Sequence, residues 1–309
     1  MRQTFIRTLI ELGEKNKKIV LLTGDLGYTV VEPFAERFPD RFFNVGVAEQ
    51  NMVGVATGLA EAGFIPYVYS IVTFATLRPY EFIRNGPVHH HSRVRIVGAG
   101  TGFEYGSAGA THHGLEDVGV MRIQPGMSVI IPADFQQARS AFLASWDCPG
   151  PVYYGIGKDE KYTVPGLQGR FGLGQAQIVR EGHDVAILAM GAVVPEAVAA
   201  AEMLAARGIQ AEVVVVASVA PAPESDLIAV LSRFKTVMTV EAHYATGGLG
   251  SLVAEVIADH GLGCRLVRCG VKSGSDGRAG SRRYLHALHG VSTEKIVESA
   301  VGSLQKKAR

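Results

Sequence analysis

Short segments that are apolar at nearly every position alternate along this chain with stretches typical of helices. In the first half, these apolar segments span residues 19–22, 65–69, 94–97, 128–131 and 152–154. Strands without polar alternation are typical of parallel sheets whose two faces are both covered by helices. The pattern therefore predicts an α/β fold with a mainly parallel sheet.

A polar break separates this series from a second one. The charged residues 158–161 and the glycine-rich residues 163–174 interrupt the pattern, and a new apolar segment begins at residues 184–191. Because such a stretch between two apolar series is typical of a linker, we predict two consecutive three-layer domains with mainly parallel sheets. Their expected bounds are residues 1–160 and 179–309 with a linker at 161–178, and the second domain should contain strands at 212–216 and 237–241 and helices near 195–207, 224–234 and 249–260.

The composition of the chain is sufficient for a large apolar core, and its net charge is close to zero. The chain has 309 residues, 47% of them apolar, and a net charge of +1, which argues against a nucleic-acid partner. The one short basic block, residues 306–309, is expected to be a frayed, solvated tail.

No secretion-type leader opens the chain and no apolar run reaches the ~18 residues that cross a bilayer, so we expect a soluble, cytoplasmic protein without membrane contact. The three cysteines, Cys148, Cys264 and Cys269, are too scattered for a disulfide framework or a metal site and are expected to be reduced.

One carboxyl group stands among apolar and small residues. Glu49 lies within residues 44–52, which run into the glycine-rich residues 53–60 at the approach to a helix. Ionisation is costly there unless another group shares the proton. The residues alone leave two interpretations open: a solvated glutamate that suits the positive end of the helix dipole, or a buried carboxyl with a chemical role.

The order of the motifs around Glu49 resembles the transketolase family. Residues 47–52 (VAEQNM), the pair Thr73-Phe74, residues 109–117 (GATHHGLED) and residues 121–127 (MRIQPGM) resemble the pyrimidine-binding domain of transketolases and of the related deoxyxylulose-phosphate synthases. Residues 240–243 and 246–250 look like the C-terminal domain of the same proteins. The resemblance spans nearly the whole chain and excludes the family's N-terminal, diphosphate-binding half.

The resemblance implies a role for each residue of the pyrimidine side. Glu49 matches the carboxyl that hydrogen-bonds to ring nitrogen N1′ of thiamine diphosphate, so that the cofactor's own aminopyrimidine can remove the thiazolium proton. Phe74 matches an aromatic that stacks on this ring, which contributes ~1 kcal/mol beyond burial. Leu77 and Tyr80 either complete the apolar wall or simply belong to the core.

Two histidines follow the glycine-rich residues 106–109. His112 stands where transketolases have a Thr-His pair, and an imidazole beside the reactive carbon can bind substrate oxygens and shuttle protons near neutral pH. His113 is the weaker substrate-binding candidate. The run at residues 89–91, also histidine, has no cysteine or carboxylate at ligand spacing and is expected to be an exposed turn without metal.

Further candidates for sugar-phosphate binding come from spacing relative to Asp25. Arg2 matches one of the family's two phosphate-binding arginines, Thr29 stands in the place of a serine, and Lys158 stands in the place of the second arginine. A lysine is a point charge and cannot form the bidentate contact of a guanidinium. The phosphate contact is therefore expected to be weaker than in the family.

Two departures concern the substrate itself. Gly100 occupies the place of a phosphate-binding histidine, and Ala108 replaces an aspartate that recognises a sugar hydroxyl. Donor stereochemistry is therefore left open. The acceptor or donor is expected to be an unusual compound, and an unphosphorylated one is an alternative to a sugar phosphate.

The diphosphate side is missing. The family holds the diphosphate and Mg²⁺ with a Gly-Asp-Gly segment followed by an asparagine, because the metal needs carboxylate and amide oxygens beside the phosphates. The nearest string, Ser-Asp-Gly at residues 275–277, is more typical of a turn. We expect a partner subunit to carry the diphosphate-binding domain and the Mg²⁺ ligands, in an α2β2 assembly whose exposed apolar rim also favours self-association.

The favoured function is therefore the C-terminal subunit of a two-component transketolase, which moves a two-carbon ketol unit from a ketose to an aldehyde. A deoxyxylulose-phosphate synthase-like condensation stays open. A third possibility is the β subunit of a 2-oxoacid decarboxylating complex, whose histidine segment differs from residues 111–117. A non-catalytic interaction subunit is disfavoured because Glu49, Phe74 and His112 occur together.

Overall fold

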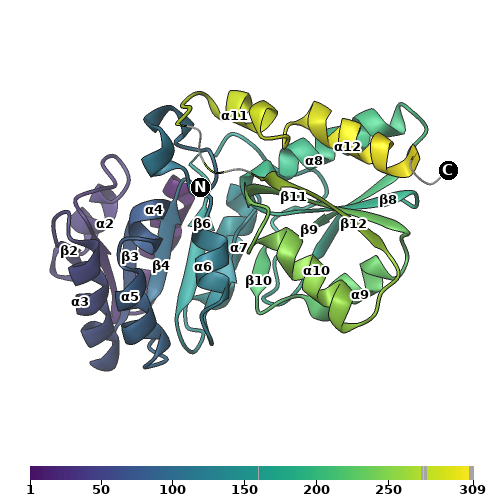
Figure 1. Cartoon of the computed structure of the whole chain (residues 1–309). Helices are drawn as coiled ribbons and strands as arrows, with labels where there is room; N and C mark the ends of the chain where they lie inside the picture. The colour runs from purple at the N-terminus through teal and green to yellow at the C-terminus, as the bar shows by residue number, and fades with distance from the viewer. Residues whose placement is uncertain (159, 273, 275–276, 306–309) are drawn as a thin grey trace.

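The computed structural model describes residues 1–158, 160–272, 274 and 277–305, which form two α/β domains built on two sheets (Figure 1). The basic tail at 306–309 and most of the expected turn at 275–277 lie outside the described residues. Within the described ranges, every helix is too short or too polar to cross a lipid bilayer. All three cysteine thiols are free.

The first sheet has seven strands in the order β10-β5-β6-β4-β3-β1-β2. All neighbouring pairs are parallel except β10 with β5. The central strands are buried along their whole length because helices cover both faces (Figure 1). The strands are β1 (Ile19–Thr23), β2 (Phe42–Asn44), β3 (Ile65–Ile71), β4 (Arg95–Ala99), β5 (Ser128–Ile130), β6 (Val152–Ile156) and β10 (Ser218–Ala220).

Successive residues of these strands point to opposite faces and enter two different cores. Ile19 and Leu21 of β1 pack with helices α1, α2 and α7, whereas Val20 and Leu22 pack with α3, α4, α5 and α6. Continuous apolar strands are therefore required by burial on both sides. The helices are α1 (Arg2–Lys15), α2 (Glu32–Arg37), α3 (Glu49–Glu61), α4 (Val72–Thr76), α5 (Tyr80–Ile83), α6 (Asp117–Arg122) and α7 (Phe135–Ser145), with the short turns η1 (Pro39–Arg41), η2 (Arg84–Val88), η3 (Gly106–Ala108) and η4 (Ala110–His112).

The second sheet has five strands in the order β12-β11-β8-β9-β7, of which only the edge strand β7 is antiparallel. Helices again lie on both faces of the sheet (Figure 1). The elements are β7 (Gln177–Arg180), β8 (Val185–Ala189), η5 (Gly191–Val193), α8 (Val194–Ala205), β9 (Ala211–Val215), α9 (Glu224–Leu231), β11 (Thr236–Tyr244), α10 (Leu249–Asp259), β12 (Arg265–Val271), α11 (Arg282–Leu288) and α12 (Thr293–Gln305).

The expected α/β class and the mainly parallel sheets are confirmed, and four strands are additional to those expected. β2 and β10 have three residues each, too few for a periodic signal. β7 begins at Gln177, inside the stretch expected as a linker, and β12 carries arginines that break up an apolar run. β10 also leaves its own domain and pairs with β5 of the first sheet, a contact that no local pattern encodes.

Candidate functional site

The residues expected at the site gather at one edge of the first sheet. Strands β1, β3, β4 and β6 are parallel neighbours in this sheet, so their carboxyl ends meet at the same edge. Four of the expected segments follow these ends: residues 24–29 after β1, Phe74 after β3, residues 100–113 after β4 and Lys158 after β6. In open α/β sheets, this edge is where ligands bind.

Glu49 is fully buried at the first position of α3. Gly24 makes room for it, since a Cβ atom at residue 24 would lie 3.3 Å from the Glu49 Cγ atom. The interpretation of Glu49 as a solvated helix-start residue is therefore wrong. Its Oε2 atom lies 2.5 Å from Nη1 of Arg78, whereas Oε1 is buried without a hydrogen-bond partner among the described residues. An unpartnered carboxylate oxygen in the interior is costly, and a bound group that donates a hydrogen bond would remove that cost.

Phe74 lies on α4, is half-buried and contacts the same arginine, Arg78, as the Glu49 carboxylate. The Arg78 guanidinium carbon lies 4.3 Å from the centroid of the Phe74 ring. The His112 ring approaches Phe74 from another segment, with 5.2 Å between centroids and an interplanar angle of 69°. Thr73 donates a hydrogen bond to the carbonyl oxygen of Thr111 at 3.1 Å, which ties α4 to the histidine segment. The fold therefore brings Glu49, Phe74 and His112 into one place.

Leu77 and Tyr80 flank the same segment in different surroundings. The Leu77 side chain is 40% exposed, which leaves it available to a ligand or a partner surface. Tyr80 is half-buried and donates a hydrogen bond to the Val120 carbonyl oxygen at 3.1 Å, and its hydroxyl also accepts one from the side chain of Gln124. The polar end of Tyr80 is therefore held by α6 and by the turn that follows it.

The two adjacent histidines have different environments. His112 is half-exposed, and its Nδ1 atom lies 2.9 Å from the Thr111 hydroxyl oxygen. His113 is buried, its Nε2 atom lies 3.2 Å from the Gly106 carbonyl oxygen, and its ring meets Phe103 edge to face at 5.2 Å. His112 therefore faces the Phe74 side, while His113 lies in the interior of the 101–113 segment.

Two of the phosphate-binding candidates are close together. Arg2 Nε donates to the Lys158 carbonyl oxygen at 3.4 Å, and Lys158 Nζ lies 4.7 Å from the centroid of the Tyr105 ring. That ring also explains Gly100. A Cβ atom at residue 100 would lie 2.2 Å from two Tyr105 ring carbons, so a histidine could not replace this glycine without displacing the tyrosine.

The substrate-binding candidates Asp25 and Thr29 lie on a strained loop. Both have positive φ angles, 57° and 65°, which are uncommon for residues with a side chain and cost free energy. The Asp25 carboxylate accepts a hydrogen bond from Asn44 at 2.9 Å, and the Thr29 carbonyl oxygen accepts one from Gln3 of α1 at 2.7 Å. Backbone strain that the surroundings maintain is typical of ligand-binding loops.

A buried cluster between the two domains was not expected from sequence. His243 of β11 and Asp117 of α6 are both buried, with 3.2 Å between Nε2 and Oδ1, and Tyr153 of β6 donates to the second Asp117 oxygen at 2.5 Å. Burial lowers the pKa of His243, but the charges of Asp117, Glu241 and Glu116 outweigh this effect and raise it above its usual value. Residues 116–117 and 240–243 were recognisable as motif positions, but their partners were not.

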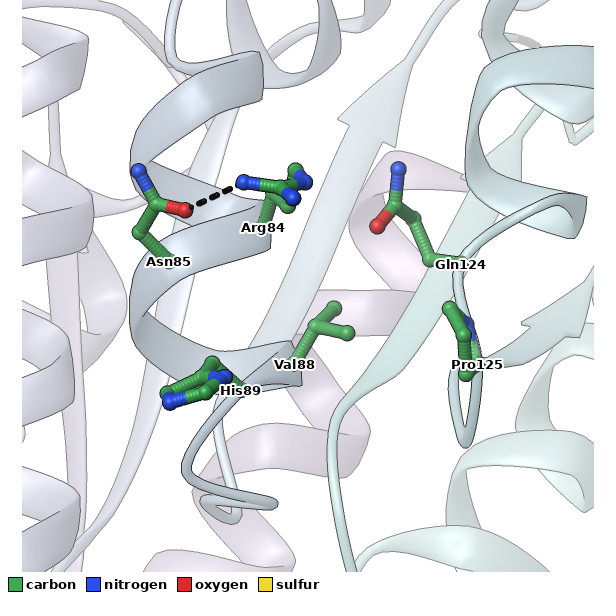
Figure 2. A pocket seen from close by; sticks show the side chains of 6 residues that line it. All are labelled: Arg84, Asn85, Val88, His89, Gln124 and Pro125. Atoms are coloured by element: carbon green, nitrogen blue, oxygen red, sulfur yellow. Dashed lines mark hydrogen bonds between the residues drawn. The ribbon is translucent and has the colours of Figure 1, made fainter.

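A cavity of about 690 Å³ lies between η2 and the turn after α6 (Figure 2). Gln124, which lines it, donates a hydrogen bond to the Tyr80 hydroxyl. The lining of the cavity contains none of the residues expected at the site. The expected exposed turn at residues 89–91 follows η2, and all three histidines are exposed. Arg84 and Val88 lie on the side of the helix toward Gln124 and Pro125, whereas Asn85 and His89 extend from its other side (Figure 2).

The edge of the first sheet offers two groups to a planar, nitrogen-containing ring. A buried carboxylate oxygen without a partner and an adjacent half-buried ring fit an aminopyrimidine, which offers a ring nitrogen and a flat face. Among the described residues, no group of three or more His, Cys, Asp or Glu side chains is arranged to hold a metal ion. The fold and these two groups are compatible with a protein of the α/β class that binds an aminopyrimidine ring.

Comparison with known proteins specifies the family. Residues 1–159 match the family described as the transketolase pyrimidine-binding domain, and residues 174–296 match the transketolase C-terminal domain. The first match covers more than half of the chain. This chain therefore belongs to the transketolase family, as its motifs predicted.

Individual relatives agree with this assignment. A 6-deoxy-6-sulfo-D-fructose transketolase subunit of Clostridium sp. (strain MSTE9) is 37% identical over 308 residues, which cover 99% of this chain and 95% of that protein. The 1-deoxy-D-xylulose-5-phosphate synthase of Syntrophotalea carbinolica is 35% identical, but the match covers 96% of this chain and only 46% of that protein. A solved structure described as a split gene transketolase, inactive beta4 tetramer, is 35% identical, superposes with a TM-score of 0.88 and covers 98% and 97% of the two chains.

Proposed function

We propose that this chain is the C-terminal subunit of a two-component, thiamine diphosphate-dependent transketolase that transfers a two-carbon ketol unit from a ketose to an aldehyde. The observation that carries this proposal is the buried, unpartnered Oε1 atom of Glu49 beside Phe74. The subunit-length match to a relative named as a transketolase subunit supports it.

Each residue of the pyrimidine side has a distinct task in this proposal. Glu49 Oε1 shares a proton with ring nitrogen N1′, and Phe74 and Leu77 exclude water from the ring. Tyr80, whose hydroxyl is engaged by α6 and the turn after it, supports this wall from behind. When bound, thiamine diphosphate supplies a stabilised carbanion through its thiazolium ring.

The substrate side is formed by residues at the ends of the neighbouring strands. His112 faces the Phe74 side and binds or protonates substrate oxygens. Lys158 and Arg2 provide positive charge, and the strained loop with Asp25 and Thr29 completes the rim. His113 maintains the histidine segment from inside, since its ring is buried and lies against the Gly106 carbonyl.

A partner subunit is required to complete the site. We propose that it brings the diphosphate-binding domain and the Mg²⁺ ligands and that the assembly is α2β2. Exposed apolar side chains close in sequence to Glu49 and Phe74 offer a surface for the partner subunit. Val47, Leu77 and Phe82 are 71%, 40% and 43% exposed. Val47 precedes Glu49 by two residues, and Phe82 lies 3.8 Å from the Cβ position of Gly54 on α3. The split transketolase structure described as a beta4 tetramer supports oligomerisation of this chain.

Reconstitution with the partner subunit tests this function. The isolated chain should show negligible thiamine diphosphate binding by calorimetry with Mg²⁺ present, and ketol transfer should appear when the partner is added. Glu49→Gln keeps the shape of the side chain but removes its acid-base function. It should lower turnover by at least about 10²-fold while the cofactor still binds.

The control for this variant is Glu81→Gln, which changes an exposed glutamate of α5 and should have no effect. Full turnover by the chain alone would contradict the two-component assignment. Near-normal turnover of Glu49→Gln would contradict the role of the carboxyl.

A deoxyxylulose-phosphate synthase-like reaction is the second candidate because the 35% identity to such a synthase spans 96% of this chain. The two functions differ in one product. A synthase releases carbon dioxide from pyruvate, whereas ketol transfer from a ketose releases none. Measuring carbon dioxide from the reconstituted pair with pyruvate and an aldehyde decides between them.

A further inference from the structure

Arg78 touches both residues that the proposed function assigns to the pyrimidine ring. Its Nη1 atom lies 2.5 Å from Glu49 Oε2, and its guanidinium carbon lies 4.3 Å from the Phe74 ring centroid. Helical backbone bonds continue past α4, since the amides of Leu77 and Arg78 both donate to the Thr73 carbonyl oxygen. Phe74 and Arg78 are four residues apart on this turn, which places the two side chains on the same face.

The contact divides the carboxylate of Glu49 into two unequal oxygens. Oε2 has a charged donor, whereas Oε1 is buried and has no partner among the described residues. The last torsion of a glutamate side chain is soft, so a buried carboxylate does not select one orientation by itself. A charge-assisted bond from a planar guanidinium does select one, and stacking on Phe74 holds that guanidinium in turn.

We propose that Arg78 is a positioning residue for Glu49: it holds Oε2 and leaves Oε1 as the single carboxylate oxygen that receives ring nitrogen N1′ of thiamine diphosphate. The inference rests on the proposed function and adds a residue to it. Arg78 itself needs no contact with the reacting atoms, because it acts through the carboxylate.

The charge of Arg78 also offsets the cost of burying the Glu49 carboxylate, whose side chain is fully buried. Removing Arg78 should therefore leave this carboxylate without its charged donor and weaken recognition of N1′.

A different arrangement would give the opposite result. The guanidinium contacts both Glu49 and Phe74, so it could instead occupy the place of the ring itself and leave when the cofactor binds. In that case, removing Arg78 would tighten cofactor binding, because no side chain would need to be displaced. The direction of the affinity change therefore distinguishes the two arrangements.

The experiment measures cofactor recognition in the reconstituted pair of subunits by calorimetry, independently of turnover. Two probes are titrated with Mg²⁺ present: thiamine diphosphate and an analogue in which N1′ is replaced by a C–H group. The ratio of their affinities reports the contact between Oε1 and N1′. Arg78→Gln should lower this ratio about tenfold, the range of one hydrogen bond to a charged group.

Matched variants separate charge from shape. Arg78→Lys keeps the positive charge but loses the planar donor, so the affinity ratio should fall only partway. If Arg78→Gln does not assemble, the ratio measured for Arg78→Lys decides in its place. Arg84→Gln removes another exposed arginine, one bonded to its neighbour Asn85, and should leave the ratio unchanged.

Two results would contradict the role of Arg78, and a third would contradict the proposed function on which it rests. An unchanged ratio in Arg78→Gln, together with a lost ratio in Glu49→Gln, would remove Arg78 and retain the proposed function. Tighter binding of thiamine diphosphate by Arg78→Gln would favour displacement of the guanidinium. If Glu49→Gln leaves the ratio unchanged, the proposed function itself fails.

Discussion

His112 and His113 are neighbours in the sequence but have opposite orientations in the structure. His112 meets Phe74 edge to face, and His113 is buried against Phe103 and the Gly106 carbonyl. The sequence motif places one histidine near the substrate, and only burial shows which side chain is free to face it. Arg78 is the converse case, since no motif singled it out before its contacts with Glu49 and Phe74 were seen.

Replacing His112 should affect substrate conversion and not cofactor binding. We expect His112→Ala to lower turnover of the reconstituted enzyme by about 10²-fold, the lower end for loss of an acid-base group, because its half-exposed ring can contact the substrate. Thiamine diphosphate affinity, measured by calorimetry, should stay within a few fold of the wild type. His89→Ala, an exposed histidine, serves as control. A parallel loss of cofactor affinity would place His112 on the cofactor side.

Among the secondary-structure elements, β4 carries an unusual buried charge. Arg95 is fully buried although its strand is central in the first sheet. Its guanidinium donates to the carbonyl oxygens of Trp146, Gly150 and Cys148, with distances of 2.9 Å and 2.7 Å to the first two. The arginine thereby ties β4 to the segment between α7 and β6. Three backbone carbonyl oxygens of this segment accept its hydrogen bonds.

Removing this guanidinium should destabilise the chain strongly. Arg95→Met keeps much of the volume but leaves the three carbonyl oxygens without their donor, so we expect a loss of about 3–5 kcal/mol in the free energy of unfolding. Urea denaturation of the isolated chain measures it. Arg93→Met, two residues earlier and half-exposed, should cost less than about 1 kcal/mol. Equal effects of the two variants would show that the carbonyl contacts contribute little.

At the scale of the whole molecule, strand pairing and a buried side-chain contact join the two domains in addition to the connecting chain. β10 of the second half completes the first sheet beside β5, and His243 of β11 meets Asp117 of α6 in the interior. The pKa of His243 is raised, because the nearby carboxylates outweigh the effect of burial. Burial raises the pKa of Glu241 and of Glu116 in the same cluster.

The raised pKa of His243 predicts a pH dependence of stability. The folded chain binds this proton more tightly than the unfolded chain, so the stabilisation is complete below the ordinary value of 6.5 and is lost as pH rises through the raised value. The free energy of unfolding should fall above pH 6.5 by at most about 1.4 kcal/mol per pH unit for this one proton. Urea denaturation at a series of pH values measures it.

His243→Gln should remove this neutral-range dependence and leave the part caused by Glu241 and Glu116, whose window begins above 4.5. His183→Gln, an exposed histidine, should keep the wild-type profile. A profile that is the same in all three proteins would contradict the interdomain ion pair as its cause.

The sequence by itself determined the fold class, most of the central strands and the candidate residues at their ends. Continuous apolar runs indicate strands that are buried on both faces, and motifs indicate residues that a given chemistry requires. Both can therefore be recognised from short stretches of sequence. The tertiary structure alone decided that Glu49 is buried with one oxygen paired to Arg78, that β10 joins the first sheet, and that His243 meets Asp117. These contacts join residues that are 29 or more positions apart, and such pairs are selected by topology and shared burial, which no local pattern specifies.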